Sequence, residues 1–239
     1  MTYRRILLKL SGEALAGERG QGLDPAVLQA LVEDLKILVT RGVQLALVVG
    51  AGNFFRGLSS RGRQMQRVTA DYIGMLGTVM NSLAVADFLQ QAGVPAVVMS
   101  AIEMPRLCEL VQPLRAVKLL ENGTVVLFAG GTGNPYFTTD STAALRAAEI
   151  GADAVFKATK VDGVYSSDPK RDPHAQRFDT ITYEDVLLRN LQVMDLTAIT
   201  LCNENRLPIV VFNMTIPGNI VRVIEGQAIC TRVIPTTFS

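Results

Sequence analysis

Residues 129–144 read A-G-G-T-G-N-P-Y-F-T-T-D-S-T-A-A, and they decide how the rest of the chain is interpreted. An apolar run, 125–128, precedes this stretch, and a helical pattern follows it. The glycines allow the backbone to turn tightly and to bring its N–H groups close to a ligand. Thr138, Thr139 and Asp140 stand where the helix would begin and are suited to cap it. A glycine-rich turn leading into a helix N-terminus favours binding of a phosphate or another anion. An ordinary βα loop with a good cap is the alternative.

Alternating apolar and helical segments continue on both sides of this stretch. We expect strands at 6–10, 43–49, 95–99, 125–128, 153–157, 209–212 and 229–233. We expect helices at 25–38, 69–91, 113–121, 140–150, 183–190, 195–206 and 217–225, with Asp71 in the first turn of the second helix. This alternation predicts an α/β fold with a central, mostly parallel sheet covered by helices on both faces, a three-layer αβα sandwich. Residues 17–22 are interpreted as a mobile surface turn, and 158–177 as a long polar loop.

The composition indicates a globular chain with a substantial core. The 239 residues are 49% apolar and 19% charged, which suits one large domain or two small lobes. A net charge of +1 argues against bulk electrostatic binding of nucleic acid or a membrane surface. We expect no signal peptide and no segment long enough to span a bilayer. Cys108, Cys202 and Cys230 lack C-x-x-C spacing and are expected to be reduced thiols in a cytoplasmic protein.

Several expected strands end in unusual residues. These strand ends are 9–12, 50–56, 129–140 and 159 onward. Ligands of parallel sheets bind at the carboxyl ends of the strands, so we expect these segments to line one cleft. Lys9 lies inside an apolar strand, where it costs desolvation unless it reaches a partner. The alternative is a lysine that extends to solvent from an edge strand.

The motifs exclude several kinds of chemistry. There is no G-x-x-x-x-G-K-[S/T] sequence, and the G-A-G that begins at Gly50 has Phe55 where a dinucleotide-binding motif needs its third glycine. His174 is the one histidine, so a histidine-based triad or a zinc site is not expected. A group of arginines, Arg61, Arg63 and Arg67, forms either a nucleotide-facing patch or a solvated face.

Phosphoryl transfer fits these residues best. This chemistry depends mainly on positioning and on neutralising charge. An acceptor phosphate has a second pKa of about 6 and is a nucleophile at pH 7 without a base. Lys9 would neutralise charge on the transferred group, and Arg56 would bind phosphate oxygens. Asp140 would be repelled by phosphates unless it holds a lysine, either Lys9 or Lys157; plain helix capping is its alternative role.

Segments spread along the chain resemble the amino-acid kinase superfamily. They are Lys9-Leu10-Ser11-Gly12, Gly50-Ala51-Gly52-Asn53, the helix at Asp140, and Lys160-Val161-Asp162-Gly163-Val164-Tyr165. Within the superfamily, the segments 52–57, 71–76 and 133–140 are similar to those of the bacterial uridylate (UMP) kinases. The resemblance covers nearly the whole chain from Lys9. One departure is Ala51, where many relatives have glycine; alanine is tolerable there if its φ stays negative.

The resemblance implies an activity: reversible transfer of the γ-phosphate of ATP, with Mg²⁺ held mainly by the ATP phosphates, to UMP, giving UDP in pyrimidine nucleotide synthesis. It implies a single domain, 1–239, with the UMP side at about 1–157 and the ATP side at about 158–239. The implied catalytic residues are Lys9, Arg56 and Asp140. The implied ATP contacts are Lys9, Leu10, Ser11, Gly12, Gly52, Arg56, Thr159, Tyr165 and Asp168. The implied UMP contacts are Ala51, Asp71, Thr132, Gly133, Asn134, Pro135, Tyr136, Phe137, Thr138 and Thr139.

The resemblance also implies assembly and regulation. The family is typically a homohexamer, often activated by GTP and inhibited by UTP. The stretch that matches a GTP-associated segment consists of Gly17, Glu18, Arg19, Gly20, Gln21 and Gly22. Two other functions remain open: a kinase of the same superfamily that phosphorylates a carboxylate or carbamate, and a non-catalytic nucleotide sensor.

Overall fold

The computed structural model describes residues 3–55, 65–169, 171–172 and 174–236. The strands are β1 (Arg5–Leu10), β2 (Gln44–Val49), β3 (Ala96–Ser100), β4 (Glu109–Leu110), β5 (Val125–Ala129), β6 (Ala154–Thr159), β7 (Thr180–Thr182), β8 (Ile209–Asn213) and β9 (Thr231–Ile234). The helices are η1 (Gly12–Arg19, a 3₁₀ helix), α1 (Pro25–Thr40), α2 (Arg67–Gln91), α3 (Pro113–Glu121), α4 (Thr139–Glu149), α5 (Tyr183–Leu188), α6 (Leu196–Glu204) and α7 (Asn219–Ile224).

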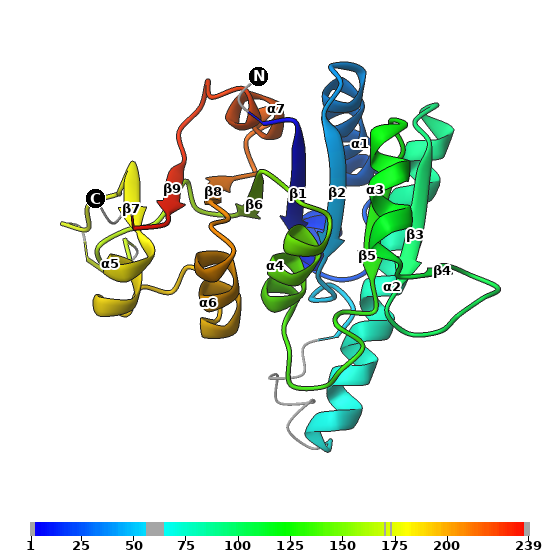
Figure 1. The fold of residues 1–239 in the computed structure, drawn as a ribbon, viewed down its shortest axis with the longest axis horizontal. Coiled ribbons are helices and arrows are strands. Elements are labelled where there is room, and N and C mark those ends of the chain that lie inside the picture. Colours follow the sequence, from blue (N-terminus) through cyan, green and yellow to red (C-terminus); the bar gives the residue numbers. More distant parts are fainter. Residues whose placement is uncertain (1–2, 56–64, 170, 173, 237–239) are drawn as a thin grey trace.

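In this part of the chain the strands form one sheet, in the order β4-β3-β5-β2-β1-β6-β8-β9-β7 (Figure 1). Each neighbouring pair is parallel except β8 with β9. The predicted α/β class and mostly parallel sheet are confirmed. Every residue of β2 and of β5 is buried, as expected of central strands covered on both faces.

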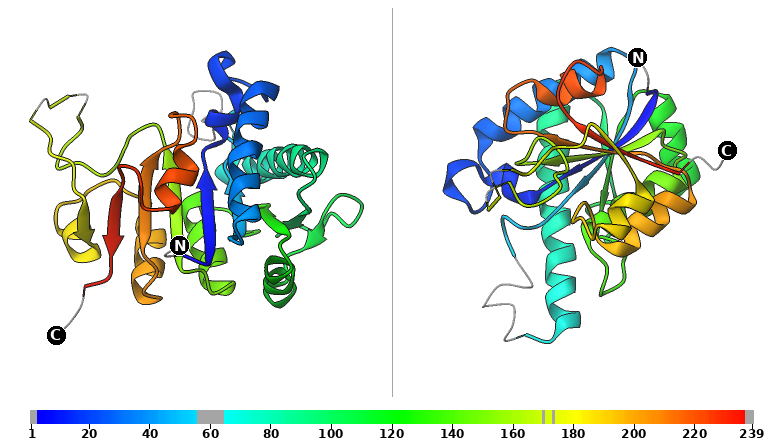
Figure 2. Two further views of the ribbon diagram at one scale, coloured as in Figure 1. Left: turned by 90° about the horizontal axis from the view of Figure 1, so that it is seen from above. Right: turned by 90° about the vertical axis from the view of Figure 1, so that its left-hand side faces the viewer.

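Helices cover both faces of the sheet. Alternate side chains of a strand point to opposite faces, so Ile6 and Leu8 of β1 join one core with α1, α2 and α7. Leu7 joins the other core with α3, α4, α5 and α6. The right-hand view of Figure 2 looks along the sheet and shows α1 and α7 on one side of it and α4 and α6 on the other. The three-layer αβα arrangement is therefore confirmed.

The parallel order brings the predicted strand ends together. β1, β2, β5 and β6 run in the same direction and lie near the middle of the sheet. Their carboxyl ends meet at one edge, where Gly50 N–H donates to the carbonyl of Leu10 at 2.9 Å. This edge carries the segments that sequence analysis placed in one cleft.

The interpretation of 17–22 as a mobile surface turn is confirmed for the surface location, since residues 17–21 are exposed, but residues 17–19 belong to a helix and not to a turn. Residues 12–19 form the 3₁₀ helix η1, interrupted at Gly17 by a φ of 55°. Beyond it, Gly22 is tied to Asn53 by both of its backbone groups, at 3.0 Å and 2.7 Å. The strands β4 and β7 were not expected either, because two and three residues are too short to show an alternating pattern.

The helix α2 differs from expectation in two ways. It begins at Arg67, two residues early, so Asp71 lies in its second turn and not in the first. It is also 25 residues long, with a mean hydropathy of 1.3 over its most apolar 18-residue window, which meets the length and composition of a membrane span. The expectation that no segment does so is therefore wrong on those criteria. Half of that window is buried in the fold, against α1 and the strands β3 and β5, as in a core helix of a globular protein.

Two glycines of α2 provide a test of how α2 packs on the turn after β2. A Cβ added at Gly77 would lie 2.8 Å from the Cβ of Ala51, whereas one added at Gly74 would have no neighbour within 4 Å. We expect Gly74→Ala to raise the free energy of unfolding by up to about 1 kcal/mol, because alanine favours helix. Gly77→Ala should lower it, because α2 must move away from Ala51. Thermal and denaturant unfolding of the purified variants measure both effects.

A second substitution at Ala51 should restore the stability that Gly77→Ala loses. Adding Ala51→Gly to Gly77→Ala removes the opposing methyl group and should restore stability. If the double variant stays as unstable as Gly77→Ala, the contact with Ala51 is not the cause.

Candidate active site

Two lysines lie side by side near the middle of the sheet. β1 and β6 are parallel neighbours, and their register pairs Lys9 with Lys157. Each lysine is two residues beyond a side chain, Leu7 or Val155, in the core under α4, so both point to that face. Their side chains are 12% and 16% exposed. Two adjacent buried ammonium groups repel each other and need a counterion.

Asp140 is that counterion. It lies in the first turn of α4, and its two carboxylate oxygens are each 2.8 Å from a lysine Nζ, one from Lys9 and the other from Lys157. The expectation that Asp140 holds a lysine is confirmed, and it holds both candidates. Helix capping falls to Thr138 instead, whose Oγ1 accepts from the N–H groups of Asp140 at 3.0 Å and Ser141 at 3.4 Å.

Burial and the neighbouring charges shift the pKa values of Asp140 and Lys157. Burial alone would raise the pKa of Asp140, but Lys9 and Lys157 outweigh it and lower that pKa below its ordinary value. Burial, together with Lys9, lowers the pKa of Lys157 against the opposing effect of Asp140. Lys157 Nζ also donates to the carbonyl of Val193 at 2.6 Å. With both lysines protonated, the cluster carries one excess positive charge directed at the sheet edge.

A cavity of about 760 Å³ opens beside Lys157, between the loop after β6 and the segment 189–193. Its lining includes Thr159, Tyr165 and Asp168, three of the residues predicted to contact ATP. The Thr159 hydroxyl is bonded to both backbone groups of Val161, and the Tyr165 hydroxyl donates to Asp162 at 2.7 Å. We call this space the donor cavity.

A smaller cavity of about 240 Å³ adjoins the donor cavity and shares Lys157 and Thr159 with it. It is lined by Lys9, Ser11, Glu13 and Lys160 as well, so three lysines and one carboxylate border one small space. Such a concentration of ammonium groups suits phosphate oxygens.

A third cavity, of about 210 Å³, lies on the other side of the α4 N-terminus. It contains five of the residues predicted to hold UMP, namely Ala51, Asp71, Phe137, Thr138 and Thr139. Ala51 keeps a negative φ, as its alanine requires. We call this space the acceptor cavity. The other predicted residues, Thr132, Gly133, Asn134, Pro135 and Tyr136, belong to the same loop but do not line the cavity.

The glycine-rich loop is fastened to α2. Gly130 adopts a φ of 72°, and its N–H donates to the Thr78 hydroxyl at 2.9 Å. Tyr136 has a φ of 73°, unusual for a side chain of this size, and its N–H donates to Asp71 at 2.8 Å. Arg67 is paired with the same carboxylate at 2.8 Å. Asp71 therefore joins α2 to the loop at the acceptor cavity.

Three predicted ATP contacts, Leu10, Gly12 and Gly52, line none of these cavities, and two of them explain how the strand ends approach each other. A Cβ at Gly12 would lie 2.2 Å from the carbonyl oxygen of Gly50, and one at Gly52 would lie 2.9 Å from the Cγ of Glu13. Only glycine allows the backbone contact at Gly12, whereas a side chain at Gly52 would require Glu13 to move. Arg56, Arg61 and Arg63 fall outside the described residues, and His174 is exposed.

Sequence analysis did not identify residues 189–195 as part of the site. Residues 189–193 line the donor cavity, and Asp195 bonds to residues of α4. A signal was available, because Asp195 precedes a helical pattern and is a typical N-cap. That signal indicates a helix start and not a contact with α4.

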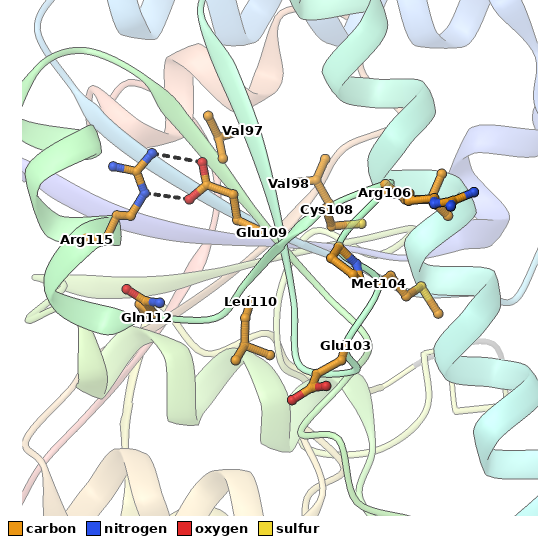
Figure 3. A pocket seen from close by; sticks show the side chains of 12 residues that line it. Val97, Val98, Glu103, Met104, Arg106, Cys108, Glu109, Leu110, Gln112 and Arg115 are labelled. Atoms are coloured by element: carbon orange, nitrogen blue, oxygen red, sulfur yellow. Dashed lines mark hydrogen bonds and ion pairs between the residues drawn. The ribbon is translucent and has the colours of Figure 1, made fainter.

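A separate cavity of about 650 Å³ lies at the β3–β4 end of the sheet, with β5 and β2 between it and β1 (Figure 3). Apolar side chains such as Val97, Val98 and Leu110 line it, together with a two-bond pair between Arg115 and Glu109, at 2.5 Å and 2.8 Å. The Arg115 guanidinium lowers the pKa of Glu109 by hydrogen bonding. None of the predicted site residues lines this cavity.

Comparison with known proteins agrees with this geometry. Residues 4–213 match the model of the amino acid kinase family. The structure of UMP kinase from Bacillus anthracis is similar, with 38% identity, a TM-score of 0.94, and coverage of 98% of this chain and 97% of the other. The UMP kinase of Ureaplasma parvum gives 38% identity, a TM-score of 0.93, and 98% and 100% coverage. The uridylate kinase of Archaeoglobus fulgidus gives 28%, 0.71, and 95% and 99%. This chain belongs to the amino acid kinase family.

Proposed function

We propose that the chain is a UMP kinase that transfers the γ-phosphate of ATP reversibly to UMP, giving ADP and UDP for pyrimidine nucleotide synthesis. The cluster of Lys9, Asp140 and Lys157 carries the proposal, because it stands between the two cavities. Lys157 lines the donor cavity, and Thr139, next to Asp140, lines the acceptor cavity. Two relatives at 38% identity, matched over almost their whole length, bear the name UMP kinase.

The reaction requires no general base from the protein. An oxygen of the UMP phosphate attacks the γ-phosphorus, and the bond from that phosphorus to the β–γ bridging oxygen breaks, so that ADP leaves. The attacking phosphate is already ionised at neutral pH. Lys9 and Lys157 stabilise negative charge on the transferred group, and Asp140 keeps both ammonium groups in place. Arg56 completes the phosphate contacts.

Mg²⁺ enters this proposal as a companion of ATP. No group of three or more His, Cys, Asp or Glu side chains able to hold a metal occurs among the residues that the structure describes. The ion commonly keeps several waters and binds through substrate phosphates, which suits a phosphate site lined by lysines. When bound, it neutralises charge on the phosphates; the lysines orient and hold the same groups.

The two substrates divide the single domain between them. The acceptor cavity is lined by residues between 51 and 139, and the donor cavity by residues between 157 and 211. This supports a UMP side at about 1–157 and an ATP side at about 158–239, joined by the β1–β6 pair. The cysteines are free thiols, which supports placing the reaction in the cytoplasm.

The proposal also includes activation by GTP and inhibition by UTP. The stretch 17–22 is fastened through Gly22 to Asn53, whose amide is bonded reciprocally to Asn81 of α2 at 2.7 Å and 2.9 Å. An effector near Gly17–Gly22 would thus act on the helix that carries Asp71. UTP would inhibit by occupying the acceptor cavity through its uridine part.

The lysine cluster leads to the first prediction on activity. Lys9→Met should lower kcat by about 10²–10³-fold while changing the KM for UMP little, because its charge matters most in the transition state. Asp140→Asn should lower kcat similarly, since it leaves two buried ammonium groups without their counterion. Steady-state kinetics with both substrates measure this. Lys36→Met, on the exposed face of α1, is the matched control; an unchanged kcat in Asp140→Asn would reduce Asp140 to a structural residue.

An acceptor comparison tests the function itself. With MgATP, UMP should support faster release of ADP than CMP, dUMP, acetylglutamate or carbamate. Asp71 would accept a hydrogen bond from a ribose hydroxyl of UMP. Asp71→Ala should therefore raise the KM for UMP by about tenfold, the loss of one charged hydrogen bond, and should narrow the difference between the KM values of UMP and dUMP. If acetylglutamate or carbamate is phosphorylated and UMP is not, the chain is a carboxylate or carbamate kinase instead. Binding of nucleotides without transfer would establish the sensor.

We also propose that the chain assembles into a homo-oligomer, namely a homohexamer. On α2, Val68, Tyr72, Leu76 and Met80 recur every fourth residue and are 39–50% exposed, forming an apolar stripe. No charged residue lies between Asp71 and Asp87. Leu76→Glu should therefore give a smaller species in size-exclusion chromatography with light scattering. Leu188→Glu, at a site 77% exposed on α5, should not. An unchanged mass for Leu76→Glu would exclude the stripe as an interface.

A further inference from the structure

Asp195 connects two helices at the active site. It is the N-cap of α6, and its carboxylate accepts from the N–H of Ala198 at 2.8 Å. The same carboxylate accepts from the Ser141 hydroxyl at 2.8 Å and 3.0 Å and from the hydroxyl of Thr138. Thr138 and Ser141 stand on either side of Asp140 in the chain. Asp195 therefore holds the turn of α4 from which Asp140 reaches both lysines.

The segment before Asp195 faces the ATP side. Residues 189–193 line the donor cavity, and the Val193 carbonyl accepts from Lys157 Nζ at 2.6 Å. Thr138, by contrast, lines the acceptor cavity. Asp195 follows this segment by two residues in the chain, so the backbone from Val193 and the bonds of Asp195 to Thr138 and Ser141 together connect the donor cavity with the acceptor cavity.

Helix capping alone does not explain these bonds. Two other N-caps of the described chain bond within their own helix: Asp24 accepts from Ala26, and Thr182 bonds to Asp185. Docking of α6 on α4 does not explain them either. Ala143, Ala147 and Ile199 belong to the buried apolar core between these helices, which holds them together without the carboxylate.

We propose that Asp195 is a positioning residue that couples the two substrates. Contact of ATP with 189–193 fixes the position of Asp195, and Asp195 in turn fixes the first turn of α4. That turn places Thr138 to bind UMP and Asp140 to hold the two lysines. Asp195 touches neither substrate. The inference rests on the proposed function, and it adds that ATP and UMP strengthen each other's binding. This coupling is reciprocal by thermodynamic necessity.

Asp195→Asn tests this role, because asparagine caps a helix as well as aspartate does. Its amide has a single acceptor oxygen, which cannot serve Ala198, Thr138 and Ser141 as the carboxylate does. Calorimetry would measure the Kd of UMP with and without a non-hydrolysable ATP analogue and Mg²⁺. In the unaltered protein we expect the analogue to tighten UMP binding by about fivefold or more. In Asp195→Asn this factor should fall toward one and kcat should fall about tenfold, with the Kd of each nucleotide alone little changed.

Two further variants separate coupling from structure. Ser141→Ala should reduce the coupling in part, and adding it to Asp195→Asn should reduce it no further, because both act through one bond. Asp24→Asn is the same substitution at the N-cap of α1, which lines none of the three cavities of the site, and it should leave coupling and kcat unchanged.

The outcomes are distinct. Absence of coupling in the unaltered protein overturns the inference, as does unchanged coupling in Asp195→Asn. If Asp195→Asn raises the Kd of each nucleotide, measured without the other, by the same factor and also lowers the Tm, Asp195 is a purely structural cap. Failure of the unaltered protein to phosphorylate UMP would instead overturn the proposed function.

Discussion

One buried carboxylate between two buried ammonium groups is the interaction on which the rest of this structure depends. Neither lysine would be tolerated in the middle of a parallel sheet by itself, since desolvation opposes its charged form. The register of β1 against β6 places the two lysines together, and the first turn of α4 brings Asp140 to both. The cluster is therefore a product of the sheet and one helix end, and the loops around it line the neighbouring cavities.

The glycine-rich turns serve this arrangement by permitting close approach. Gly12 lies against the carbonyl of Gly50, and Gly130 lies against Ser100 and donates to Thr78. Ala51 shows the same constraint from the opposite side, because its methyl group fits where α2 presents Gly77. Packing between backbone segments thus limits which side chains each turn can carry, independently of any contact with a nucleotide.

Most of the fold was predictable because its strands are continuous apolar runs and its helices have clear caps, such as Asp24 with Pro25 in α1. The elements that escaped prediction, β4, β7 and η1, are too short or too irregular to leave a periodic signal. Lys9 and Asp140 were predictable at the site, since a lysine in a strand and an acid beside a phosphate turn each require an explanation. Asp195 and the carbonyl of Val193 were not, because their importance lies in which distant elements they touch. Sequence spacing does not record such contacts across a fold.

The pairing of β1 with β6 has a consequence for how the protein is made. Of the described strands β1 is synthesised first, but β6, its second neighbour in the sheet, follows only about 145 residues later. Until β6 emerges, Lys9 has no Lys157 beside it, although β2, β5 and α4 have already been synthesised. A nascent chain can thus assemble β1, β2, β3 and β5 around an incomplete centre, and the cluster of Lys9, Asp140 and Lys157 is complete only after β6 has been synthesised.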